Sequence, residues 1–274
     1  MKWDKDAEDE VSRVPFFVRK RVKKRIEEEA ASQGSKVVTI LHVQACRKRF
    51  LGSMEDEVKG FQVENCFGPS GCPNRAVHDG GMVRRIEELL AARDLKAFLR
   101  ERVKGPLKFH HEFRVSVSDC PNACSRPQIA DIGLIGAAPP AVSDSPCTGC
   151  GECVAACREK AISIDNFDGP VIDHSKCLPC GKCISACPSG TLVIAQQGWR
   201  ILVGGRLGRH PRLALELSGI FKTDEALKVI DKCLDLYMTH NVEGERFGEV
   251  IDRLGFEAIE KDLVSVIKRR SGRM

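Results

Sequence analysis

Eight cysteines, arranged as two copies of one spacing, constrain this chain more than any other feature of its sequence. The segment CTGCGECVAACREKAISI (147–164) returns thirty residues later as CLPCGKCISACPSGTLVI (177–194). Each copy has the spacing C-x2-C-x2-C-x3-C, in which three thiolates hold one four-iron cube and the fourth reaches a neighbouring cube. The repeat is confined to this stretch, so it predicts a duplicated small module with two 4Fe-4S clusters.

Because the fourth cysteine of each copy binds the cluster of the other copy, the spacing predicts which thiolates share a cluster. One cluster should be held by Cys147, Cys150, Cys153 and Cys187. The other should be held by Cys177, Cys180, Cys183 and Cys157. The alternative is a pair of zinc sites or reduced core cysteines, which two complete copies of the spacing disfavour. The module resembles bacterial two-cluster ferredoxins, and this resemblance implies two low-potential clusters that exchange single electrons.

Composition and the first residues of the chain indicate which compartment and which partners to expect. The chain has 274 residues and fourteen cysteines, and the tight clustering of the cysteines favours metal binding over disulfides. Its first residues, MKWDKDAEDE, are acidic without an apolar signal region, and no run is long enough to span a bilayer. A net charge of +5 and 5% aromatic residues give little support for nucleic-acid binding. We therefore expect a cytoplasmic, anaerobic-type protein with no membrane span and no nucleic-acid partner.

Four further cysteines form a second constellation. Cys66 and Cys72 lie in CFGPSGC, and Cys120 and Cys124 lie in CPNAC. Glycine and proline around each pair allow the backbone to turn tightly against a ligand. Four thiolates suffice for a third 4Fe-4S cluster, with a structural zinc or free thiols as the alternatives.

Two longer segments carry a family resemblance. SVSDCPNACSRPQIADIGLIG (116–136) resembles the siroheme-cluster motif of the sulfite and nitrite reductase family, and GWRILVGGRLGRHPRLA (198–214) resembles the segment that closes that family's siroheme site. The resemblance covers about residues 60–265, interrupted by the ferredoxin-like module. It implies that the second constellation binds a cluster and that Cys124 also bridges to the siroheme iron. It further implies that the siroheme carboxylates are neutralised by Arg206, Arg209 and His210 and by the backbone N–H groups of Gly204 and Gly205, with an ordinary solvated basic loop as the alternative.

The chain departs from the family pattern where the substrate would bind. The family's lysine–aromatic–lysine triplet is replaced by Glu112, Phe113 and Arg114, and a usual glycine is replaced by Asp119. Arg114 is the expected substrate-binding cation, whereas Glu112 is expected to repel sulfite. The related first half of complete siroheme reductases is not recognisable in this chain.

The expected fold class is α+β, with a siroheme-reductase-like mixed sheet and helices. Residues 1–55 resemble the small C-terminal domain of the light-independent protochlorophyllide reductase B subunit, through VPFFVRKRVKKRIEEEA. The expected division is 1–55 for that helical domain, 56–139 and 197–274 for the reductase-like region, and 140–196 for the inserted module. Periodicity predicts helices over 15–34, 82–104 and 224–237 and from about 245, strands over 37–43, 113–118 and 199–205, and a linker over 136–146.

The function that the resemblance implies is that of a reductase subunit. Electrons from a redox donor protein would enter the ferredoxin-type clusters, pass to the siroheme-coupled cluster and reduce a small oxyanion, most simply sulfite. A second reductase subunit or a homo-oligomer is the expected assembly. The alternatives are an electron-transfer protein without a functional siroheme site and a tetrapyrrole-binding accessory subunit.

Overall fold

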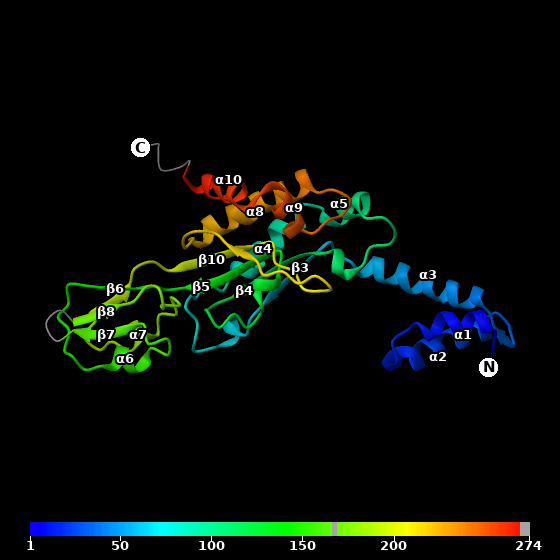
Figure 1. Cartoon of the computed structure of the whole chain (residues 1–274), viewed down its shortest axis with the longest axis horizontal. Coiled ribbons are helices and arrows are strands. Elements are labelled where there is room, and N and C mark those ends of the chain that lie inside the picture. Colours follow the sequence, from blue (N-terminus) through cyan, green and yellow to red (C-terminus); the bar gives the residue numbers. More distant parts are fainter. Residues whose placement is uncertain (166–168, 269–274) are drawn as a thin grey trace. The chain divides into compact units, whose positions relative to one another are not determined.

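The computed structural model describes residues 1–165 and 169–268. The chain folds into two compact units (Figure 1). The first contains residues 1–59 and 103–111, and the second contains residues 60–102 and those from 112 onward.

The N-terminal unit is mainly helical. Its elements are β1 (Lys2–Trp3), α1 (Lys5–Ser12), α2 (Phe16–Ser32), β2 (Val37–Val38) and α3 (Ile40–Glu57). β1 and β2 pair in parallel, and the helices enclose a small apolar core built from residues such as Val11, Ile26 and Ala30. The helix predicted over 15–34 is confirmed, with Pro15 at its N-cap. Its first turn does not cover the core, however, because the ring of Phe17 is 74% exposed.

The strand predicted over 37–43 is wrong beyond its first two residues. Val37 and Val38 do form β2, but helix α3 begins at Ile40. His42 accepts a hydrogen bond at Nδ1 from the backbone N–H of Thr39, at 3.0 Å, and so closes a capping box. The usual third residue of a capping box is Glu or Gln, so the histidine gives no sign in the sequence that a helix begins here. The neighbouring β-branched residues instead suggest a strand.

The second unit is built on a mixed five-stranded sheet of order β11-β10-β5-β4-β3. Its strands are β3 (Phe61–Asn65), β4 (Phe113–Ser118), β5 (Ile132–Ala137), β10 (Gly198–Val203) and β11 (Leu215–Glu216). β3, β4 and β5 run parallel, while β10 is antiparallel to both β5 and β11. The strands predicted over 113–118 and 199–205 are thereby confirmed. β4 lies between β5 and β3 and is almost wholly buried, so neither of its faces is exposed to solvent despite its alternating sequence.

Helices pack on this sheet and bury an aromatic cluster (Figure 1). They are α4 (Met82–Ala91), α5 (Leu95–Arg102), α8 (Thr223–His240), α9 (Phe247–Leu254) and α10 (Phe256–Lys268). The ring of Phe113 in β4 lies 5.0 Å from that of Tyr237 in α8 and 5.8 Å from that of Phe247 in α9. Large buried rings such as these contribute strongly to the stability of a core. The helix predicted over 82–104 is instead two helices, because Asp94 adopts a positive φ of 42° between them.

The cysteine repeat folds as a small duplicated module. Each copy is a strand, a cysteine loop, a short helix and a second strand: β6 (Pro140–Val142), α6 (Glu152–Ala156) and β7 (Ile162–Asp165), then β8 (Gly169–Ile172), α7 (Lys182–Ser185) and β9 (Leu192–Ile194). The first strand of each copy pairs with the second strand of the other, as β6 with β9 and β8 with β7. The copies are thus interlocked. The linker predicted over 136–146 is wrong in part, since it contains β6.

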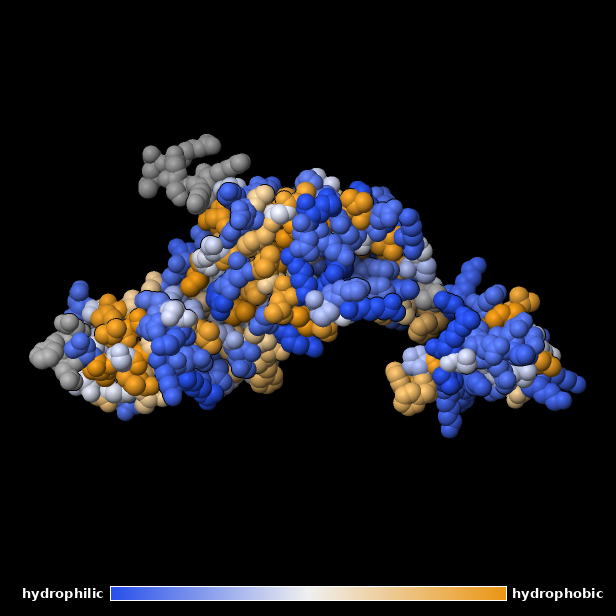
Figure 2. Space-filling model, viewed as in Figure 1, coloured by the Kyte–Doolittle hydropathy of each residue, from blue (hydrophilic) through white to orange (hydrophobic). Residues whose placement is uncertain are grey.

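The module is too small to cover all of its apolar side chains. Figure 2 shows hydrophobic residues at its surface. Val142, Val171 and Ile194 of the module are 49%, 50% and 47% exposed. The predicted helix from about 245 is confirmed as α9 and α10. No helix in the described ranges combines the length and apolar character that crossing a membrane requires.

Candidate metal centres

Two parallel strands bring the second cysteine constellation together. Cys66 follows the end of β3, and Cys120 lies just beyond the end of β4. Because β3 and β4 are parallel neighbours, their carboxyl ends meet at one edge of the sheet, where loops form binding sites. The backbone N–H of Cys66 donates to the carbonyl of Val117 at 2.9 Å, which fixes this register through to the first cysteine.

Backbone and amide N–H groups surround these thiols. The N–H groups of Gly68 and Asp119 both donate to Cys66 Sγ at 3.3 Å, and Asn122 Nδ2 donates to Cys124 Sγ at 3.0 Å. Burial raises the pKa of the Cys120 thiol; the backbone at Asn122 lowers this pKa, and three nearby thiols raise it further, those of Cys124, Cys66 and Cys72. The other three thiols therefore lie within electrostatic reach of Cys120, which is buried, whereas Cys124 is exposed.

A buried ion pair joins the two cysteine segments. Asp119, which is 3% exposed, accepts a hydrogen bond from Arg75 Nε at 2.8 Å. Its carbonyl oxygen accepts from the N–H groups of Ala76 and Val77, at 2.8 and 3.2 Å. Burial raises the pKa of the Asp119 carboxyl, and Arg75 opposes that rise. The sequence marks Asp119 as a departure from its family but gives no sign that Arg75 is its partner.

Thiols of the repeat also gather across the two copies. Burial raises the pKa of Cys153, which is reached by the thiols of Cys187 and Cys147. Burial likewise raises the pKa of Cys177, which is reached by Cys180 and Cys157. The fourth cysteine of each copy thus lies near a cysteine of the other copy, Cys187 near Cys153 and Cys157 near Cys177.

A cavity of about 300 Å³ separates the two kinds of cysteine site. On one side it is lined by Cys120, Pro121 and Asn122 of the CPNAC loop. On the other it is lined by one of the two cysteine sets of the repeat: Cys157, Cys177, Cys180 and Cys183. The module is tied to the sheet at this point, because the N–H of Ala138 donates to the carbonyl of Pro179 at 2.8 Å.

The donor set of the sheet-edge constellation bears on what it can hold. Its members are four thiols, those of Cys66, Cys72, Cys120 and Cys124. Four thiolates are the donor set that a 4Fe-4S cluster takes.

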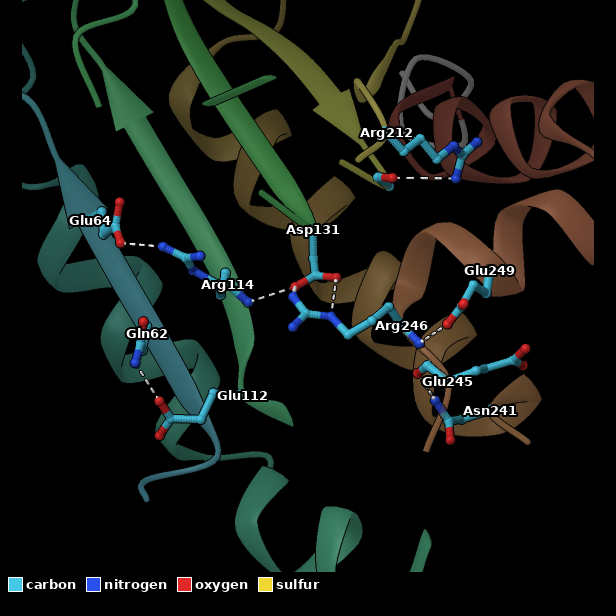
Figure 3. A network of polar contacts seen from close by, with 11 residues as sticks. Gln62, Glu64, Glu112, Arg114, Asp131, Arg212, Asn241, Glu245, Arg246 and Glu249 are labelled. Carbon is cyan, nitrogen blue, oxygen red and sulfur yellow. Dashed lines mark hydrogen bonds and ion pairs between the residues drawn. The ribbon is translucent and has the colours of Figure 1, made fainter. Parts of the chain in front are cut away.

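The substrate residues predicted at the start of β4 are engaged within the fold (Figure 3). Glu112 is 2% exposed and accepts hydrogen bonds from the N–H of Gly60 at 3.2 Å and from Gln62 Nε2 at 2.5 Å. The carboxylate of Glu112 is thus buried against two neutral donors and does not face solvent, and its expected repulsion of sulfite stays a prediction. Arg114 forms an ion pair with Glu64, and Glu64 also lies 3.8 Å from Arg126.

Residues 204–210 were expected to bind the siroheme carboxylates. Some of their polar groups are engaged in contacts within the fold. The N–H of Gly204 donates to the carbonyl of Asp131 at 2.7 Å, so the prediction that this N–H is available for a siroheme carboxylate is wrong. Arg206 donates to the His210 carbonyl and pairs with Glu249 at 2.5 Å. Arg209 and His210 are exposed.

A small cavity of about 30 Å³ joins this segment to the cysteine loops. Leu207 lines it together with Arg114 of β4 and with Ser125 and Arg126, which follow Cys124. Arg126 adopts a left-handed backbone with φ 60°, which holds its guanidinium beside Glu64. The sequence prediction did not include Arg126, although its place two residues after Cys124 was a signal.

Comparison with known proteins agrees with both predicted resemblances. Residues 62–270 match the family described as the nitrite and sulphite reductase 4Fe-4S domain. Residues 3–47 match the family described as the proto-chlorophyllide reductase 57 kD subunit. The resemblance predicted for the N-terminal residues is therefore confirmed.

Individual relatives cover the chain to different extents. It is 32% identical over 200 residues to the coenzyme F420-dependent sulfite reductase of Methanocaldococcus jannaschii, covering 72% of this chain but 31% of that protein. It is 26% identical over 251 residues to the C subunit of the anaerobic sulfite reductase of Salmonella typhimurium, covering 84% and 70%. The crystal structure of dissimilatory sulfite reductase I superposes with a TM-score of 0.51 at 21% identity, covering 73% of this chain and 51% of that one, a likeness of fold that confirms the α+β class.

The extent of the family match decides the assignment. It spans most of the chain and includes β3, β4, β5 and β10 with the cysteine loops that follow the first two. Because the match covers well over half of the chain, the chain belongs to the nitrite and sulphite reductase 4Fe-4S domain family.

Proposed function

We propose that this chain is a siroheme-type reductase subunit that delivers electrons from two ferredoxin-type clusters, through a third cluster, to a small oxyanion, most simply sulfite. When bound, the clusters supply one-electron transfer and siroheme supplies the iron at which the oxyanion is reduced. Within this proposal, residues 1–55 form an accessory helical domain, 140–196 the electron-entry module, and 56–139 with 197–274 the reductase region.

The observation that carries the proposal is the cavity between the CPNAC loop and the repeat. Cys120 lines it from the sheet side, and Cys177, Cys180 and Cys183 are among the repeat cysteines that line it. If the two ligand sets are as the spacing predicts, this juxtaposition leaves a short path between the module and the sheet-edge constellation. The N–H donors around Cys66 and Cys124 would stabilise negative charge on the thiolates there.

Siroheme would be held where the CPNAC loop meets the 204–210 segment. Cys124 is exposed, as a bridging ligand must be, and Arg209 and His210 are exposed on the neighbouring loop. Arg126 supplies a further cation at the joining cavity. These charges suit a carboxylate-rich tetrapyrrole.

Anaerobic purification followed by iron, sulfide and tetrapyrrole analysis tests the proposal. We expect about twelve cluster irons per chain from three four-iron clusters, and isobacteriochlorin absorbance bands. Cys124→Ser should remove the magnetic coupling between cluster and siroheme and abolish sulfite reduction, while both ferredoxin-type clusters persist. Zinc without acid-labile sulfide, or an unaltered siroheme spectrum in Cys124→Ser, would contradict the proposal.

A second candidate is an electron-transfer protein without a working siroheme site. The ion pairs that engage Arg114 and Arg206 favour it, because they neutralise two of the cations expected at the tetrapyrrole and substrate. Three clusters without any tetrapyrrole would decide for this candidate. Bound tetrapyrrole without sulfite-dependent oxidation of a reduced dye would instead indicate an accessory subunit.

A further inference from the structure

The two copies of the cysteine motif differ in charge at matching positions. Aligning 147–164 with 177–194 sets Glu152 against Lys182 and Arg158 against Pro188. Glu152 and Lys182 each begin the short helix of their copy, after a glycine with φ 78° and 74° respectively. Two nearly identical local structures thus present an anion in one copy and a cation in the other.

The cations belong to the cysteine set that lines the cavity beside Cys120. Lys182 lies between Cys180 and Cys183, and Arg158 directly follows Cys157. Both side chains line this cavity, where Glu159 is the single carboxylate among the lining residues. They also line an adjoining cavity of about 600 Å³ that has no carboxylate among its lining residues. Neither Lys182 nor Arg158 has an ion-pair partner in the described part of the chain, so their charges are not neutralised locally.

The other cysteine set, which consists of Cys147, Cys150, Cys153 and Cys187, has a carboxylate instead of cations beside it in the sequence. Glu152 stands between Cys150 and Cys153, and no lysine or arginine occurs from Ser143 to Cys157. Its fourth member, Cys187, is followed by Pro188, where the other copy has Arg158. Cys147 and Cys150 are also exposed, whereas no repeat cysteine that lines the cavity is.

Charge next to an iron–sulfur cluster sets its reduction potential. Reduction adds one negative charge, so a nearby cation stabilises the reduced state and a nearby carboxylate destabilises it. We propose that Lys182 and Arg158 hold the potential of the cluster of Cys157, Cys177, Cys180 and Cys183 above that of the cluster beside Glu152. An electron then moves favourably from the exposed side of the module toward Cys120, oxidising the first cluster and reducing the second. A one-electron donor protein reduces the first cluster again.

This inference rests on the proposed ligand sets but not on siroheme. It treats Lys182, Arg158 and Glu152 as positioning charges that touch neither substrate nor tetrapyrrole. A reduction potential is the decisive readout, since a purely structural role for these exposed or half-exposed side chains would leave it unchanged.

Redox titration of the full, anaerobically reconstituted chain, followed by electron paramagnetic resonance, tests the proposal. We expect two separable ferredoxin-type potentials. Lys182→Gln and Arg158→Gln should each lower the higher potential, and Glu152→Gln should raise the lower one. Lys228→Gln, which removes an exposed charge on α8, is the matched control and should move neither.

Several outcomes would overturn the inference. The first is a single, shared potential for both clusters in the wild type. The second is a shift of the lower potential in Lys182→Gln. The third is no shift in any of the variants Lys182→Gln, Arg158→Gln and Glu152→Gln. Failure of the ferredoxin-type clusters to assemble would overturn it together with the ligand sets. Absence of tetrapyrrole with the expected potential shifts would instead sink the reductase proposal and leave this inference standing.

Discussion

At the scale of single residues, Asp119 stands where the family usually has glycine, and the neighbouring residues accommodate its charge. The carboxylate of Asp119 fits because Gly68 has no side chain: a Cβ at Gly68 would lie 2.4 Å from Asp119 Oδ2. Arg75 then compensates the buried charge at 2.8 Å. Asp119 therefore links both cysteine segments through its side chain and its backbone.

Breaking the Arg75–Asp119 pair should cost more than breaking an exposed pair. Asp119→Ala leaves Arg75 uncompensated in a site where its side chain is 15% exposed, so we expect a loss of about 2–3 kcal/mol in unfolding free energy. A double-mutant cycle with Arg75→Ala, followed by urea unfolding, should give a coupling near 2 kcal/mol. The half-exposed pair Arg200–Glu216 is the control, with an expected coupling below about 1 kcal/mol. Equal couplings would show that burial of Asp119 contributes nothing.

Glu112 is a second residue whose role changes once its surroundings are known. Glu112→Lys would place a cation against the N–H of Gly60 and the amide of Gln62, both of which donate to the present carboxylate. We expect a loss of about 3 kcal/mol or more, and about 1–2 kcal/mol for Glu112→Gln, which keeps one acceptor. Thermal unfolding of both variants measures this order. A stable Glu112→Lys variant with tighter sulfite binding would restore the view of Glu112 as a substrate-facing residue.

At the scale of elements, one strand controls how closely the cluster loop approaches the sheet. Gly136 in β5 lies under Asp119, and a Cβ there would meet the Asp119 carbonyl oxygen at 2.3 Å. Because that atom belongs to rigid backbone, Gly136→Ala must displace the segment that leads into Cys120. On the proposed function, we expect loss of the third, sheet-edge cluster alone, with iron falling from about twelve to about eight per chain. Gly80→Ala, which meets nothing within 4 Å, should retain the full iron content.

The sequence predicted elements well where their pattern was local. The cysteine repeat, β4, β10 and α8 follow from spacing or periodicity within each segment. Helix α3 was missed because the third residue of its capping box is a histidine, and the break before α5 was missed because Asp94 adopts an unusual φ. Pairings such as Asp119 with Arg75, or Arg114 with Glu64, depend on which strands are neighbours and could not be read along the chain.

At the scale of the whole molecule, length separates this chain from complete reductases. It spans 31% of the F420-dependent sulfite reductase and about half of the dissimilatory sulfite reductase I chain that it matches. The cations available for an oxyanion are correspondingly few. Arg114 pairs with Glu64, Arg206 pairs with Glu249, and Arg126 also faces Glu64. On the proposed function, we therefore expect slow sulfite reduction by the chain alone, with further cations supplied by a second subunit.

Glu64 is the residue through which this expectation can be tested within the chain. Its carboxylate is half-buried between Arg114 and Arg126, beside the small cavity that Leu207 closes. Glu64→Gln keeps the shape of the side chain and removes its charge, so both guanidinium groups regain their full attraction for a doubly charged anion. At a partly exposed site such a charge change amounts to about 1 kcal/mol or more, which corresponds to a several-fold lower apparent Michaelis constant for sulfite. Glu216→Gln, which frees Arg200 at β10 and lies outside the cavity lining, should leave the constant unchanged. An unchanged constant in Glu64→Gln would place the anion away from Arg114, whereas an equal fall in both variants would reveal only the change in net charge.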